Sequence, residues 1–225
     1  MVADYDFPKR FGRYMLKKLI AKGGMGEVFL AYDTTCDRHV ALKKIRPDLL
    51  KYKNSPIRFI QEAKIAAKLS HPSIIPIFDI IQTEDQMYYT MPFIEGESLR
   101  DILYKTIETI KTSAPNHPVG GSIFSLAQIF LQVCQAIAFS HSNGILHRDI
   151  KPGNIMIGKF GQVLLLDWGL AKALLDTSIE DDQDIPILQE GEDLTRPGKA
   201  VGTLSFLAPE RAIGNPPQYK QIFTH

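Results

Sequence analysis

Runs rich in apolar, β-branched and aromatic residues occupy much of the first part of the chain. Short runs of this kind, bounded by turn residues, are typical of strands. Five segments have this character: 11–20, 27–32, 39–45, 74–81 and 86–93. The glycine-rich stretch 21–26 separates the first two and predicts a hairpin tip. Glycines let such a tip fold over a polyphosphate and turn its N–H groups toward it.

A period near 3.6 residues predicts a helix over 55–70, which begins with the start signals Ser55 and Pro56. One carboxylate falls in the middle of its apolar stripe. The stripe consists of Phe59, Glu62, Ala66 and Leu69. A charge buried in such a stripe needs a partner. The alternative is that Glu62 is an ordinary solvated helix residue.

Two more helices are predicted at 98–110 and 125–142, separated by a stretch at 111–121 whose prolines and glycines favour a loop. Ser125 and Gln128 fit a capping box, and Asn143 with Gly144 fits a left-handed helix end. The apolar stripe of the second helix is predicted to contain Ile123, Ala127, Phe130, Cys134 and Ile137.

Composition agrees with a soluble enzyme of one or two domains: 225 residues, 44% hydrophobic, 23% charged, with a formal net charge of +1. This charge gives no indication of nucleic-acid binding. Residues 1–10 lack the apolar core of a signal peptide, and we expect no membrane segment and a cytoplasmic location. Cys36 and Cys134 are far apart in sequence, which favours buried, reduced thiols.

Four polar side chains with metal-phosphate chemistry lie close together in the sequence: Asp149, Lys151, Asn154 and Asp167. The apolar runs 155–157 and 163–166 between them predict a second hairpin, which would bring Asn154 alongside Asp167. Both could then share one Mg²⁺ ion. The alternative is a polar turn between two strands.

These patterns resemble the motifs of the protein kinases. Residues 147–154 match the catalytic loop H-R-D-x-K-x-x-N, and 167–169 match D-F-G with Trp168 in place of Phe. Residues 21–28 match the glycine-rich loop, with Ala21 at its first glycine, and 40–43 match V-A-I-K. The glycine tip and Trp168 most resemble the bacterial Hanks-type serine/threonine kinases, near the chlamydial PknD group, over residues 11–220.

The resemblance implies an α+β, bilobal protein-kinase-like fold. Residues 1–91 would form an N-lobe with a five-stranded antiparallel sheet and one helix, and 92–225 a partial, mainly helical C-lobe. The hinge would be 92–96 and the activation segment 167–210. The implied reaction is transfer of the γ-phosphate of ATP, with Mg²⁺ or Mn²⁺, to a serine or threonine of a protein substrate.

The resemblance also implies roles for individual residues. The catalytic residues would be Asp149, Lys151, Lys43 and Glu62, with Lys43 and Glu62 forming an ion pair. The nucleotide-binding residues would be Ala21, Gly23, Gly24, Gly26, Val28, Ala41, Lys43, Met91, Pro92, Ile94 and Met156. The metal ligands would be Asn154 and Asp167. Met156 could equally be a core methionine.

The segment 174–193 contains many acidic residues and neither Lys nor Arg, which predicts a solvated loop. The expected autophosphorylation sites are Thr195, Thr177 and Ser178, while Thr203 would contact Asp149 and Lys151. After Glu210 the sequence lacks the helices that the family places there, so we expect a C-terminally truncated domain that is inactive or barely active. The rival functions are a catalytically incompetent truncated fragment or ATP-binding scaffold and, third, a small-molecule phosphotransferase.

Overall fold

The computed structural model describes residues 6–52, 54–83, 86–112, 123–169 and 172–173. Six strands form an antiparallel sheet in the order β1-β2-β3-β4-β6-β5. Their bounds are β1 Lys9–Phe11, β2 Tyr14–Lys22, β3 Gly26–Asp33, β4 Arg38–Ile45, β5 Asp79–Gln82 and β6 Met87–Pro92. The expected count of five strands is wrong because the short β1 also pairs with β2.

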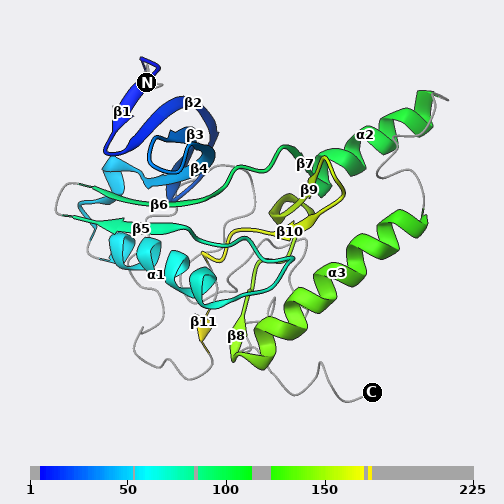
Figure 1. The fold of residues 1–225 in the computed structure, drawn as a ribbon. Coiled ribbons are helices and arrows are strands. Elements are labelled where there is room, and N and C mark those ends of the chain that lie inside the picture. Colours follow the sequence, from blue (N-terminus) through cyan, green and yellow to red (C-terminus); the bar gives the residue numbers. More distant parts are fainter. Residues whose placement is uncertain (1–5, 53, 84–85, 113–122, 170–171, 174–225) are drawn as a thin grey trace.

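Both faces of this sheet are covered. On one face the sheet curls around a core that contains Phe11, Tyr14, Phe29, Leu42 and Tyr88. The other face packs on α1, Asn54–Lys68, which follows the short helix η1, Pro47–Leu49. Figure 1 shows α1 below the sheet. The predicted stripe of α1 is confirmed, since its four side chains are all buried, Glu62 included.

The segment after α1 joins the sheet to the rest of the molecule. A strand was expected over 74–81, but β5 begins only at Asp79. Ile74 instead forms a parallel bridge with Leu165. Leu165 N donates to Ser73 O at 2.8 Å, and Ile75 N donates to Leu165 O at 3.2 Å. These bonds fix the segment that follows α1 to β10, a strand distant in the sequence.

The second half of the described chain combines two longer helices with short strands (Figure 1). The elements are β7 Gly96–Ser98, α2 Leu99–Thr112, α3 Ile123–Ser142, β8 Ile145–Leu146, η2 Pro152–Asn154, β9 Ile155–Gly158, β10 Val163–Leu165 and β11 Lys172–Ala173. Strands β10, β9 and β7 form one sheet, and β8 pairs with β11. The predicted β9–β10 hairpin is confirmed. Gly96 is required where β7 meets β9, because a Cβ there would collide with the carbonyl oxygen of Ile157.

The buried face of α3 is not the predicted one. The helix begins at Ile123, two residues before the expected cap, and buries Ile129, Val133 and Ala136. Phe130 of the expected stripe is 69% exposed. Cys134 and Cys36 are free, as predicted, but exposed, so the expectation that these thiols are buried is wrong.

Apolar residues nearly surround α3, so its period is a weak guide to which face is buried. Helix α3, with 20 residues, is long and apolar enough to cross a membrane by length and composition alone, so the expectation of no membrane segment stays a prediction. Core helices pass the same test, and α3 packs into the core beside β8 and β10.

Candidate active site

Three elements meet at Lys43. Strand β4 carries Lys43, α1 carries Glu62, and β6 carries Tyr89. Lys43 Nζ lies 2.6 Å from Glu62 Oε1 and 3.8 Å from Asp167 Oδ1. The Tyr89 hydroxyl donates to the same Glu62 oxygen at 2.7 Å. The structure therefore pairs Glu62 with Lys43, the predicted partner.

Burial and charge act in opposite directions on these groups. Burial lowers the pKa of Lys43, but the neighbouring carboxylates, chiefly Glu62, raise it well above its ordinary value. Burial raises the pKa of Glu62, and Lys43 opposes that shift. Burial and the charge of Glu62 raise the pKa of Tyr89 well above 10. Tyr89 is thus a neutral hydroxyl donor, and Lys43 a cation, across the physiological range.

The catalytic-loop residues cluster a short way along the chain from α3. Asp149 is buried, and its Oδ2 accepts from Lys151 Nζ at 2.7 Å and from Asn154 Nδ2 at 3.0 Å. Asn154 Nδ2 also donates to the Asp149 carbonyl at 2.8 Å. The three predicted residues form one hydrogen-bonded unit with the aspartate at its centre.

His147 connects this loop to the residues that follow β10. Its Nε2 lies 3.0 Å from Leu166 O, which can only accept, so Nε2 carries the proton. Its Nδ1 then accepts from Asp149 N at 3.3 Å. Burial lowers the pKa of His147, which favours this neutral tautomer. Its ring packs on Trp168, with 4.5 Å between the ring centroids.

Asn154 and Asp167 fit the expected metal site. Leu166 N donates to Asn154 O at 2.8 Å, so the β9–β10 hairpin holds the two residues at neighbouring strand ends. Because Asn154 Nδ2 is occupied by Asp149, its Oδ1 is the atom left for an ion. Asp167 has a positive φ of 60°, and its side chain is 48% exposed. A carboxylate and an amide oxygen are donors that Mg²⁺ prefers.

Several predicted nucleotide residues share one face of the sheet. Val28 pairs with both Ala21 and Lys43, and Ala41 pairs with Met91. Directly opposed residues lie on the same face, as do residues two apart, so all five project toward the α1 side. Sequence reasoning alone did not establish this common face.

The remaining predicted nucleotide residues lie at the glycine tip, the hinge and β9. The tip is closed by Gly23 N donating to Gly26 O at 2.9 Å, and Gly24 is exposed beside it. Gly26 is needed for packing, because a Cβ there would lie 2.9 Å from Lys44 O. In the predicted hinge, Pro92 and Ile94 are half-buried. Met156 is half-buried in β9, opposite Leu164 and Ser98.

Sequence reasoning missed two side chains of this site, Tyr89 and His147 as a loop anchor. The available signal for Tyr89 was its place two residues before Met91 on the same strand face. The predicted phosphorylation sites, the contacts of Thr203 and the 113–121 part of the loop lie outside the described residues.

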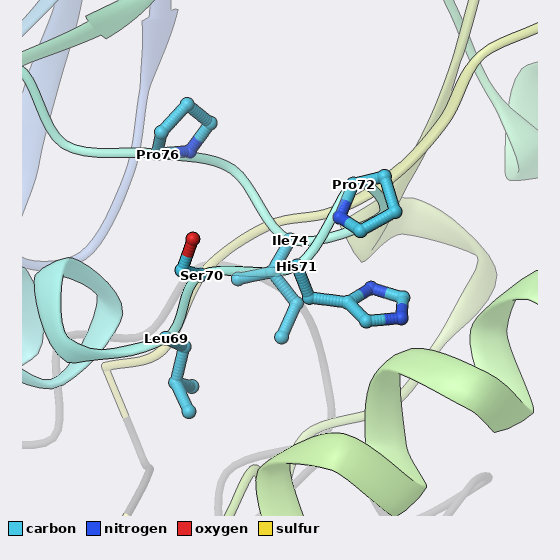
Figure 2. A pocket seen from close by; sticks show the side chains of 6 residues that line it. All are labelled: Leu69, Ser70, His71, Pro72, Ile74 and Pro76. Carbon is cyan, nitrogen blue, oxygen red and sulfur yellow. The ribbon is translucent and has the colours of Figure 1, made fainter.

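One pocket lies apart from these residues. It occupies about 310 Å³ and is lined by Leu69, Ser70, His71, Pro72, Ile74 and Pro76. Figure 2 shows it along the segment that follows α1, with the His71 ring directed toward α3. His71 packs on Phe139 there, with 5.4 Å between ring centroids.

Comparison with known proteins places these features in context. Residues 14–222 match the protein kinase domain family. Serine/threonine-protein kinase PknD of Protochlamydia amoebophila is 50% identical over 206 residues, which are 90% of this chain and 21% of that protein. The PknD of Chlamydia caviae is 44% identical over 209 residues, covering 91% of this chain and 22% of the relative.

A solved structure, "PpkA-294 apo form", superimposes with a TM-score of 0.60 at 25% identity, covering 73% of this chain and 61% of that one. The chain spans about a fifth of the length of the curated relatives it matches. The predicted kinase-like fold and the likeness to chlamydial PknD are confirmed.

Proposed function

The chain belongs to the protein kinase domain family, and on this basis we propose that it transfers the γ-phosphoryl group of ATP to serine or threonine hydroxyls of a protein. The observation that carries the proposal is the Lys43–Glu62 contact with Asp167 3.8 Å from the same lysine. This arrangement places a fixed cation beside a carboxylate suited to a metal. It is the geometry that polyphosphate binding requires.

The roles of the side chains follow from their placement. Lys43 binds the α- and β-phosphates, and Glu62 orients it. Asp149 orients the acceptor hydroxyl and takes its proton as the new O–P bond forms and the bond to ADP breaks. Lys151, held 2.7 Å from Asp149, stabilises the charge on the γ-phosphoryl group. The nucleotide base occupies the sheet face beside Val28, Ala41 and Met91.

Asn154 and Asp167 would hold Mg²⁺ or Mn²⁺ through oxygen atoms. When bound, the ion neutralises charge on the phosphates. The described protein atoms alone offer no group of three or more His, Cys, Asp or Glu side chains for a metal. Two protein ligands suit Mg²⁺, which usually takes its other positions from water and phosphate oxygens.

The substrate protein, autophosphorylation at Thr195, Thr177 or Ser178, and a cytoplasmic location are parts of this proposal. The Asp149–Lys151–Asn154 unit argues against a scaffold without catalysis, because a protein that only binds the nucleotide needs no aspartate on the acceptor side.

The test is a transfer assay with γ-labelled ATP and Mg²⁺, offering protein acceptors and small-molecule alcohols in parallel. We expect label on serine or threonine of protein, and none with Asp149→Asn. Transfer to the small molecules alone would replace the proposal with a small-molecule phosphotransferase. Nucleotide binding with no transfer to either acceptor would favour the scaffold.

A further inference from the structure

Tyr89 is a buried tyrosine in direct contact with both members of the ion pair. It sits on β6 opposite Lys43 of β4, so both side chains leave the sheet on the same face. Its side chain is 3% exposed, and its hydroxyl lies 2.7 Å from Glu62 Oε1. Lys43 Nζ lies 2.6 Å from the same oxygen and 5.6 Å from the centroid of the Tyr89 ring.

Two donors therefore converge on a single carboxylate oxygen. Among the described residues, the other oxygen of Glu62, Oε2, is buried without a hydrogen-bond partner. The rotation of the carboxylate is then set at Oε1, by Lys43 and Tyr89 together. Without the hydroxyl, Lys43 would be the remaining described donor, on a long and flexible side chain.

The Tyr89 ring cannot easily turn away from this contact. It packs on Phe59 of α1, with 5.3 Å between the ring centroids, inside the core between α1 and the sheet. A hydroxyl on a fixed ring is a pre-oriented donor. Hydrogen bonds to charged groups in a dry environment are among the stronger ones in proteins.

We propose that Tyr89 is a positioning residue for phosphoryl transfer, which holds the Glu62 carboxylate so that Lys43 stays aligned for the nucleotide phosphates. This inference rests on the proposed kinase function. It adds a third member, contributed by the sheet itself, to the Lys43–Glu62 pair.

The variant that tests it is Tyr89→Phe, which removes only the hydroxyl. The chain offers a matched control in Tyr88→Phe. Tyr88 immediately precedes Tyr89 on β6, is 5% exposed, and packs in the core on the opposite face of the sheet. Both variants remove one hydroxyl from a buried tyrosine of the same strand, so they separate the contact with Glu62 from a general effect on the sheet.

We expect Tyr89→Phe to lower kcat about tenfold, with a smaller change in KM for ATP, because an interaction with a charged partner that orients Lys43 is lost. Tyr88→Phe should keep the wild-type kcat. Melting temperatures of the two variants, measured in parallel, show whether both remain folded. Equal kcat values for wild type, Tyr88→Phe and Tyr89→Phe would overturn the role of Tyr89 and leave the kinase proposal standing.

A second measurement needs no transfer. The dissociation constant for Mg·ADP is determined for wild type, Tyr89→Phe, Lys43→Met and the double variant. We expect Tyr89→Phe to weaken binding in the wild-type background and to have no further effect with Lys43→Met, since there is no lysine left to align. Additive effects would assign Tyr89 to packing alone and overturn the proposal.

The two measurements separate the two proposals. A non-additive cycle in a chain that transfers no phosphate would retain the alignment role and refute the kinase function. Failure of the wild-type chain to bind Mg·ADP would overturn both.

Discussion

The two halves of the described chain hold their central ion pairs in different ways. Lys43 and Glu62, with side chains 14% and 3% exposed, meet beneath a sheet whose two faces are both covered. Lys151 and Asp149, at 29% and 9%, meet in a loop that follows the partly covered helix α3. The pair proposed to bind the phosphates, Lys43–Glu62, is thus part of a core. The pair proposed to face the acceptor, Lys151–Asp149, is held by hydrogen bonds within a loop. Substitutions in the two halves should therefore differ in their effects on nucleotide binding, phosphoryl transfer and the free energy of unfolding.

The sharpest contrast is between transfer and binding. Asp149→Asn should lower phosphoryl transfer at least about 100-fold, as expected for loss of a general base. Nucleotide affinity should stay near that of the wild type, because Asp149 lies on the acceptor side. Steady-state kinetics and calorimetric titration with Mg·ADP check this, with Lys43→Met as the converse control. An equal loss of affinity for Mg·ADP in both variants would contradict the separate roles assigned to Asp149 and Lys43.

Stability should distinguish the two ion pairs. Glu62→Ala leaves Lys43 as a buried cation without its main partner, and should cost about 3–5 kcal/mol of unfolding free energy. Lys151→Ala removes a pair nearer the surface and should cost at most about 1 kcal/mol. Urea unfolding measures both. Similar losses in the two variants would mean that the pairs do not differ in environment.

The two sides of α3 offer a contrast within the second half. Ile129→Ala should cost about 2–5 kcal/mol because it empties a core position. Phe130→Ser, at a neighbouring but exposed position, should change the unfolding free energy by no more than about 0.5 kcal/mol. The same urea series can include both. A large loss for Phe130→Ser would show that this face is covered in solution.

A further difference between the two halves is the effect of acid on His147. The pKa of His147 is lowered by burial, so the folded state binds this proton more weakly than the unfolded state. The stability it contributes is complete above the unfolded pKa of about 6.5 and is lost as pH falls below it, by at most about 1.4 kcal/mol per pH unit. Unfolding curves from pH 7.5 to 5.5 check this. His147→Asn should flatten that part of the profile; an unchanged slope would remove His147 as its source.

Sequence patterns predicted the fold best where one face of an element is clearly apolar. The stripe around Glu62 was correct because the opposite face of that helix is mostly polar, with Gln61, Lys64 and Lys68. The stripe on α3 was wrong because Ile, Phe, Leu and Val occur on every side of the helix. The apolar pattern therefore does not identify its buried face. The extra strand β1, Lys9–Phe11, is too short to show a period.

In the candidate site, too, only some of the residues could be predicted from local sequence. Residues within contiguous motifs, such as Asp149 and Asn154, could be named from sequence, because a short loop keeps them together. Tyr89 could not, since its contact with Glu62 depends on strand register and on the side of the sheet that α1 occupies. Such long-range pairings have no local signature.

The bonds between residues 73–75 and Leu165 also have a mechanical consequence. They hold the chain just beyond the C-terminal end of α1, and Glu62 lies about 10 Å from Leu69 along the helix axis. With a lever arm of that length, tilting the helix by about 10° moves the Glu62 carboxylate by about 2 Å. Such a displacement is most of the 2.6 Å that separates it from Lys43. A tilt of that size about this end of α1 would therefore be enough to separate Glu62 from Lys43.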